Sequence, residues 1–150
     1  MARFAFALVA ACGGLFVAAQ AIVTAGDDAK SALQGVWVGR SMEIDGKMLP
    51  ADEAKKMQFT FKGDKLFIKG NLPDGREDEC DYKIDPKQSP AHLDFTPRNE
   101  KKSLQGIYEI KDGVLKVCIR HETGSGGRPK EFATKAGSQL ILVVFDKKKS

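Results

Sequence analysis

The sequence predicts an all-β protein, an antiparallel up-and-down barrel of about eight strands with one short helix. Apolar and polar residues alternate in several short segments, for example in 57–62 and 114–120, and this period of two is typical of half-buried strands. Compact turn pairs such as Gly63-Asp64 and Asp112-Gly113 separate these segments and predict hairpins. Many short strands with short connections favour a sheet that closes on itself.

The same signals set the order of the elements. A helix is expected only at 51–56, where Pro50 precedes the segment and Asp52 and Glu53 occupy its first turn. The segment 121–137 is the longest irregular one, and its glycines at 124, 126 and 127 predict a mobile loop. Strands are expected near 35–44, 57–62, 65–69, 78–84, 91–96, 105–111, 114–120 and 139–146.

One short motif occurs twice. Leu33–Trp37 reads LQGVW, and Leu104–Tyr108 reads LQGIY. An Asp-Gly turn follows the first copy after a longer interval than the second, so the repeat is local and does not mark a duplicated domain. We expect a glycine that bends a strand start or allows close backbone approach, followed by an aromatic ring on the same face.

The N-terminal segment predicts export. Arg3 is followed by an apolar run that is too short for a comfortable membrane span, and then by small residues up to Ala25. We therefore expect residues 1–25 to be a signal peptide and 26–150 to form one domain outside the cytoplasm, periplasmic or secreted. Two alternatives remain open, a lipoprotein acylated at Cys12 and an uncleaved anchor, and only these would place the protein on a membrane.

Charge and cysteines exclude several classes. The chain has 24 Lys and Arg against 20 Asp and Glu, and loss of Arg3 with the signal peptide leaves +3, well mixed along the chain. This balance predicts no nucleic-acid partner. Alternation places Cys80 and Cys118 on opposite faces of the barrel wall, where a disulfide cannot form. A hydrophobic core must therefore hold the fold.

No catalytic or metal-binding constellation emerges. His121 is next to Glu122, but His92 is expected on a different strand. The spacing of these residues in the sequence does not match a metal-binding motif. The glycines at 124–127 lack the Lys-Ser/Thr ending of a phosphate loop. We expect no enzyme activity, no catalytic residue, no metal and no cofactor.

Seven short pieces, in order, carry a family resemblance. Gly35-x-Trp37 on the first strand resembles the Gly-x-Trp signature of lipocalin-like, or calycin, barrels. On all seven pieces, the mature chain resembles an uncharacterised family of planctomycete extracytoplasmic domains. This implies export and a lipocalin-like barrel, and it implies no catalytic residue. The pieces are Leu33-Gln34-Gly35-x-Trp37, Asp45-Gly46-Lys47, Phe61-Lys62-Gly63-Asp64, Asp85-Pro86, Leu104-Gln105-Gly106-Ile107-Tyr108, Asp112-Gly113-x-Leu115 with Cys118, and Arg128-Pro129-x-Glu131-Phe132.

The chain departs from lipocalins at its end. Their last strand usually ends near an Arg that packs on the Trp, whereas here the sequence is Phe145-Asp146-Lys147-Lys148. A lysine cannot stack as a planar guanidinium does, so the same closure is not expected.

The interior carries the functional hypotheses. Small eight-stranded barrels either fill with side chains or hold one small ligand. The first hypothesis is a binding module for an apolar or amphipathic small molecule, with Trp37 closing one end and Arg128 and Glu131 at the mouth. We expect the ligand to contact Trp37, Phe59, Phe61, Tyr82, Phe95 and Tyr108, with Leu66, Leu115, Val117, Leu140 and Leu142 completing the lining.

The alternative is a structural or protein-interaction domain with a filled core, which engages another component of the cell envelope. Exposure of Ile141, Val143 and Phe145 on the last strand would favour it. A cavity would favour the binding module.

Processing is directly testable. Since small residues end at Ala25 and charged residues follow at once, we expect a mature N-terminus at Gly26. The intact mass of the exported protein measures this, and a diacylglycerol adduct on Cys12 would contradict it.

Overall fold

The computed structural model describes residues 25–70, 72–120 and 126–149. Most of the expected signal peptide, with Cys12, lies outside these residues, as do His121 and Glu122. The elements are α1 (Ala25–Leu33), β1 (Gly35–Ile44), β2 (Lys47–Met48), α2 (Ala51–Ala54), β3 (Gln58–Lys62), β4 (Lys65–Lys69), β5 (Asp78–Asp85), β6 (Ala91–Pro97), β7 (Leu104–Lys111), β8 (Val114–Arg120) and β9 (Leu140–Lys147).

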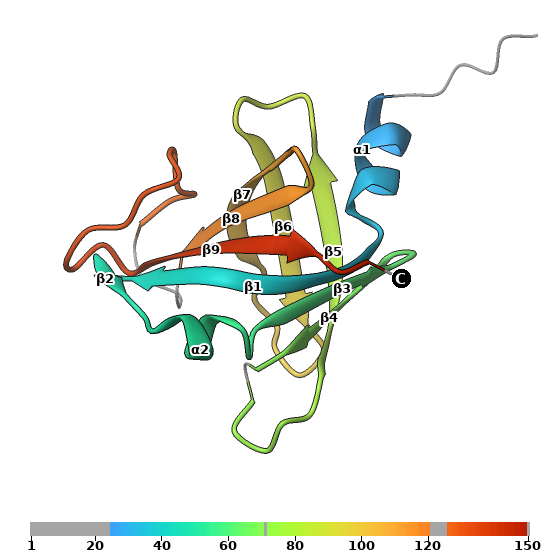
Figure 1. The fold of residues 1–150 in the computed structure, drawn as a ribbon. Helices are drawn as coiled ribbons and strands as arrows, with labels where there is room; N and C mark the ends of the chain where they lie inside the picture. Colours follow the sequence, from blue (N-terminus) through green and yellow to red (C-terminus); the bar gives the residue numbers. More distant parts are fainter. Residues whose placement is uncertain (1–24, 71, 121–125, 150) are drawn as a thin grey trace, which may run out of the picture.

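The strands form one closed antiparallel barrel (Figure 1). From β3 to β9 each strand pairs with the next along the chain, and β1 pairs with both β3 and β9, which closes an eight-stranded ring. The short β2 pairs only with the end of β1. The predicted barrel is therefore confirmed, together with a short helix at 51–54, while α1 and β2 have no counterpart in the sequence-based expectation.

The antiparallel order gives the barrel two distinct ends. The closed end carries α1, the start of β1 and the hairpins at Gly63-Asp64 and Asp112-Gly113. The open end carries α2, the loops 72–77 and 98–103, and the segment 126–139.

Strand β1 changes partner midway. It pairs with β3 from Gly35 to Val38 and with β9 from Trp37 to Ile44, and the β9 pairing has an irregularity between Gly39 and Ser41. At this bend the Gly39 amide donates to the Met57 carbonyl at 2.8 Å. A Cβ on residue 39 would lie 2.0 Å from the carbonyl oxygen of Ala54, so the crossing of α2 over β1 requires glycine here.

The repeated Leu-Gln-Gly motif is a local device. Gly35 has a φ of 115°, and Gly106 is so close to β8 that a Cβ would lie 2.8 Å from the Cys118 carbonyl oxygen. The aromatic residues that follow, Trp37 and Tyr108, are both buried in the core. Because β1 and β7 run in opposite directions, the two copies are not equivalent positions of a duplicated unit.

A single core fills much of the barrel. Nine of the residues expected in the interior are buried there: Trp37, Phe59, Phe61, Leu66, Tyr82, Phe95, Tyr108, Leu115 and Val117.

The face assigned to the last strand was wrong. Val143 and Phe145 point into the core and Ile141 packs against it, whereas Leu140 and Leu142, expected inside, lie half-buried outside the core cluster. The run from 140 to 145 is continuously apolar, so alternation cannot fix which residues face inward.

Substitution of Gly39 tests the bend in β1. The Gly39→Ala variant should lose about 3 kcal/mol of unfolding free energy, because a Cβ would strike backbone atoms of α2 rather than a flexible side chain. Chemical denaturation measures the loss. Gly127→Ala is the control, since a Cβ there meets nothing within 4 Å. Equal stability of the two variants would contradict the role given to Gly39.

Candidate functional site: the barrel cavity

The closed end of the barrel is sealed by Trp37 and the last turn of α1. The indole Nε1 donates to the Leu33 carbonyl at 2.8 Å, and both side chains are buried. Outside them, Gln34 connects the helix to the wall. Its amide nitrogen donates to the Tyr82 hydroxyl at 3.0 Å, and its amide oxygen accepts from the Gly63 N–H at 2.8 Å.

Tyr82 completes this network. Its hydroxyl donates to the Gly63 carbonyl at 2.8 Å. Burial raises the pKa of Tyr82, while the hydrogen bond from Gln34 lowers it in part. No buried side-chain nitrogen or oxygen of the described residues lacks a hydrogen-bond partner, and the bonds of Gln34 hold α1 over the end of the barrel.

The Trp37 ring also meets a cation. The Lys147 Nζ lies 5.3 Å from the ring centroid, within reach of a cation–π interaction. The sequence argued against a guanidinium stack, and the structure instead places an ammonium group over the ring.

Phe59 stands between the filled and open parts of the barrel. Its ring lies 4.6 Å from that of Phe145 and 6.2 Å from those of Phe61 and Phe95, measured between centroids. Phe61 contacts Tyr82 edge to face at 5.1 Å. These aromatic contacts fill the interior toward the closed end.

Beyond Phe59, toward the open end, lies a cavity of about 810 Å³. This volume is in the range of small-molecule sites. Its walls come from β1, β3, β4, β6, β7, β8 and β9 and from the segment around α2. The apolar lining consists of Met42, Ile44, Leu49, Met57, Phe59, Ile68, Phe95, Leu104, Ile119, Ile141 and Val143.

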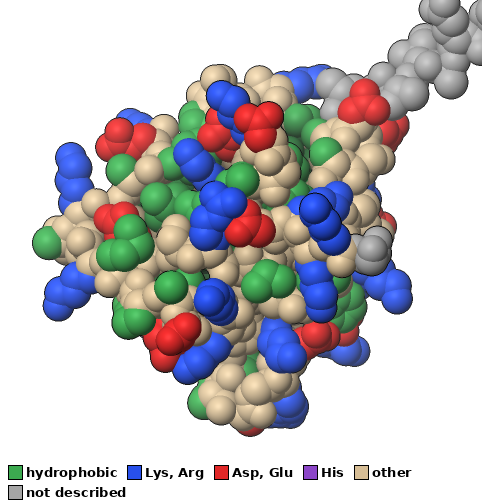
Figure 2. All heavy atoms as spheres, in the orientation of Figure 1, with side chains coloured by type: hydrophobic (Ala, Val, Ile, Leu, Met, Phe, Trp, Pro, Cys, Tyr) green, Lys and Arg blue, Asp and Glu red, His purple; other side chains and the backbone are tan. Residues whose placement is uncertain are grey.

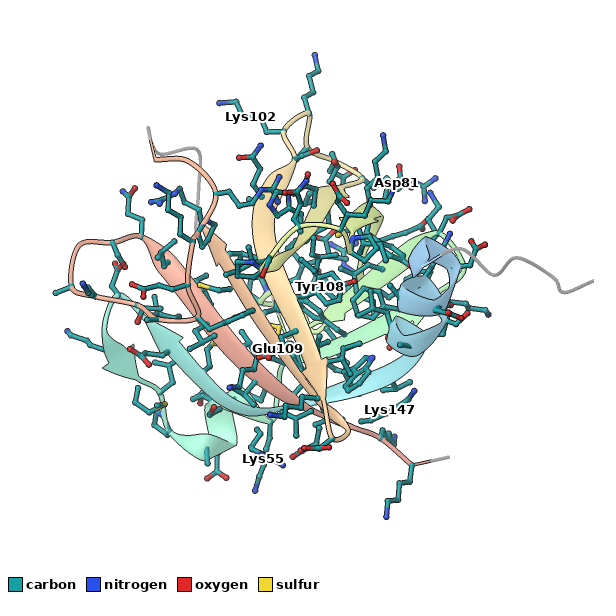
Figure 3. The ribbon with its side chains drawn as sticks, turned by 90° about the horizontal axis from the view of Figure 1, so that it is seen from above. Lys55, Asp81, Lys102, Tyr108, Glu109 and Lys147 are labelled. Atoms are coloured by element: carbon teal, nitrogen blue, oxygen red, sulfur yellow. The ribbon has the colours of Figure 1, made fainter. Side chains whose placement is uncertain are left out.

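Only part of the predicted ligand-binding set lines this cavity. Phe59 and Phe95 do, whereas Trp37, Phe61 and Tyr82 belong to the filled half of the core. Tyr108 lines a separate hollow of about 510 Å³ between α1 and the turn before β6. Figure 3 labels Tyr108 and its exposed neighbour Glu109 on β7, where alternate residues lie on opposite sides of the strand.

Four of the apolar lining residues that sequence reasoning missed come from β1 and the segment around α2, and the other five, Ile68, Leu104, Ile119, Ile141 and Val143, come from β4, β7, β8 and β9. Met42, Ile44, Leu49 and Met57 line the cavity because β1 bends away from β3 and α2 crosses the gap. Alternation within 57–62 already placed Met57 with Phe59 on one face. No local sequence pattern predicts the bend in β1.

Arg128 does not lie at the mouth. It donates to both carboxylate oxygens of Asp94, one of them at 3.1 Å, and to the Gly106 carbonyl at 2.7 Å. Asp94 lies between the inward residues Leu93 and Phe95, so this contact is on the outer wall. Glu131 is exposed, and neither residue lines the cavity.

The segment 126–139, here called the strap, lies along the outer wall. The Thr134 hydroxyl donates to the Glu43 carboxylate at 2.6 Å and accepts from the Gly46 N–H at 2.8 Å. Ile107 and Cys118, paired across β7 and β8, are fully buried although they lie outside the core cluster. An apolar patch of the outer wall is thus covered.

The two thiols occupy different sides of the wall, as the alternation predicts. Cys80 is in the barrel core and Cys118 is on the outer side, and both are free. Burial raises the pKa of Cys80 to about 12 and that of Cys118 to about 11.

The remaining surface offers few other sites. In the described ranges no group of three His, Cys, Asp or Glu side chains could hold a metal ion. Of the helices in the described part, none is long and apolar enough to span a membrane. On the face in Figure 2, basic and acidic side chains lie interspersed.

In comparisons with known proteins, no protein family, curated protein or solved structure matches the chain.

The buried thiols predict a pH dependence. Above pH 9 an unfolded thiol ionises, whereas the folded thiols stay protonated up to about pH 11. The unfolding free energy should therefore be insensitive to the thiols below pH 9 and fall above it, by up to about 1.4 kcal/mol per pH unit for each thiol.

Denaturation at a series of pH values measures this slope. The Cys80→Ala/Cys118→Ala variant provides the comparison, because it retains the contributions of the tyrosines, whose pKa values burial also raises. The variant should show a shallower fall than the native chain, and identical slopes would contradict the assignment.

Proposed function

We propose that this protein is an exported, non-enzymatic, lipocalin-like binding module that takes a small apolar or amphipathic molecule into the open half of its barrel. The cavity of about 810 Å³ beyond Phe59 is the observation that carries the proposal. Eleven apolar side chains line it, and its charged residues lie toward the loops, an arrangement suited to a ligand with a long apolar part. Export and lipocalin kinship rest on the N-terminal pattern and the Gly-x-Trp resemblance.

The energetics suit moderate affinity. A ligand that buries about 200 Å² of apolar surface gains about 5 kcal/mol before ordering costs. The filled half supports such a site, because the aromatic contacts around Phe59 fix its floor.

The filled-core alternative has weaker support. It requires an interior without room for a ligand, whereas the open half contains the cavity. Of the residues whose exposure would favour an interaction domain, Val143 and Phe145 are buried, and Ile141 is half-buried and lines the cavity.

Two adjacent residues on β9 allow a matched test. Ile141 lines the cavity and Leu142 faces the outer wall, and both are half-buried apolar side chains. We expect the purified protein to bind the neutral probe N-phenyl-1-naphthylamine saturably, with energy transfer from Trp37, its single tryptophan. Ile141→Gln should weaken this binding about tenfold or more, because it places an amide in the apolar wall.

The Leu142→Gln variant is the control and should bind the probe as the native chain does. Circular dichroism should show that both variants are folded. If the folded native chain takes up no probe, or if both variants bind it equally well, the binding module should be abandoned in favour of the structural domain.

A further inference from the structure

Five ionisable residues belong to the cavity lining, and they divide into two groups. On the α2 side, Lys56 and Glu53 form an ion pair of 2.8 Å, so their charges offset each other. On the side of β6, β7 and β8 are Glu100, Lys102 and Arg120, which together carry one net positive charge. Figure 3 shows Lys102 on the loop between β6 and β7.

The cations of the second group are available. Among the described residues, no ion pair includes Lys102 or Arg120. The guanidinium of Arg120 donates Nε–H to the Gly127 carbonyl and Nη1–H to the Ser138 carbonyl, each at 2.8 Å. An arginine has five N–H donors, so these two bonds to neutral acceptors leave it further donors, and no carboxylate of the described residues pairs with its charge.

These cations line the same cavity as apolar residues that are close to them in the chain. Arg120 follows Ile119 at the end of β8, and Lys102 lies two residues before Leu104 at the start of β7. Ile119 and Leu104 both line the cavity. A ligand whose chain lies on these residues therefore has its polar end within the region of the two cations.

We propose that the ligand is a single-chain anionic amphiphile whose head group lies between Lys102 and Arg120 and whose chain extends toward Phe59. This inference rests on the proposed function and narrows it to a chemical class. Carboxylate and phosphate head groups both fit this site, because each is an anion that accepts charge-assisted hydrogen bonds from guanidinium and ammonium groups. A cationic head would meet two like charges against the single acid Glu100.

The test compares chains of one length with different heads. The competitors for N-phenyl-1-naphthylamine on the purified protein are dodecanoate and dodecyl phosphate, each below its critical micelle concentration, and 1-dodecanol below its solubility limit. The anions should displace the probe at about tenfold lower concentration than the alcohol, and the difference should shrink as salt is added. Preference for both anions or for only one of them supports the inference and identifies the head group.

Charge variants then locate the head group. Lys102→Gln and Arg120→Gln should each weaken anion binding several-fold and leave 1-dodecanol unchanged, while Glu100→Gln should strengthen anion binding. Loss of Arg120 also removes its two hydrogen bonds to the strap. Lys102→Gln is therefore the more informative variant, because among the described residues Lys102 makes no hydrogen bond that holds another segment in place. Lys116→Gln, an exposed residue of β8 outside the cavity lining, is the control.

The two proposals fail in different ways. If the alcohol and the anions displace the probe equally well, the anionic ligand class is wrong but the binding module stands. The same holds if Lys102→Gln, Arg120→Gln and Glu100→Gln all bind the anions as the native chain does. Absence of any probe binding overturns both.

Discussion

Closure of the barrel depends on how strand β1 pairs with its two neighbours, β3 and β9. β1 must pair with β3 to continue the sheet and with β9 to close it, and its ten residues do this by bending at Gly39. After the bend, β1 no longer pairs with β3, and the gap on that side is crossed by α2 at a contact distance that excludes any side chain on residue 39. The closed ring leaves no long strand edge unpaired, and the bend determines where the interior stays open.

The two halves of the barrel interior differ in how they are filled. Toward the closed end, where Trp37, Phe61 and Tyr82 are buried, apolar packing is combined with hydrogen bonds through Gln34, and no buried side-chain nitrogen or oxygen of the described residues lacks a partner. Toward the open end β1 no longer pairs with β3, and the side chains of β1 and the α2 segment line a hollow. The stable half thus supplies a rigid floor for the hollow half.

The sequence predicted the barrel because most strands have one face toward the core and one toward solvent. In 57–62 and 78–84 the polar residues fix the phase, and the buried residues are those expected. Where both faces are covered, this signal disappears: β9 is apolar throughout 140–145 because the strap side of the wall is also shielded, so its inward face was misassigned. The site was only partly predictable for a related reason. Phe59 and Phe95 follow from alternation, but Met42 and Leu49 line the cavity through a bend that depends on residues distant in sequence.

The strap covers an apolar patch on the outer wall of the barrel. Ile107 and Cys118 lie on the outer wall with almost no exposure, and contacts of Arg128 with Asp94 and of Thr134 with Glu43 fix the strap to β6 and β1. Since these anchors lie on outward-facing positions, the strap belongs to the wall rather than to the cavity floor. Arg120 is the exception, because it lines the cavity and also holds the carbonyls of Gly127 and Ser138. Arg120 therefore joins the two sides of the wall, because the side chain that borders the cavity also holds Gly127 and Ser138, near the two ends of the described strap.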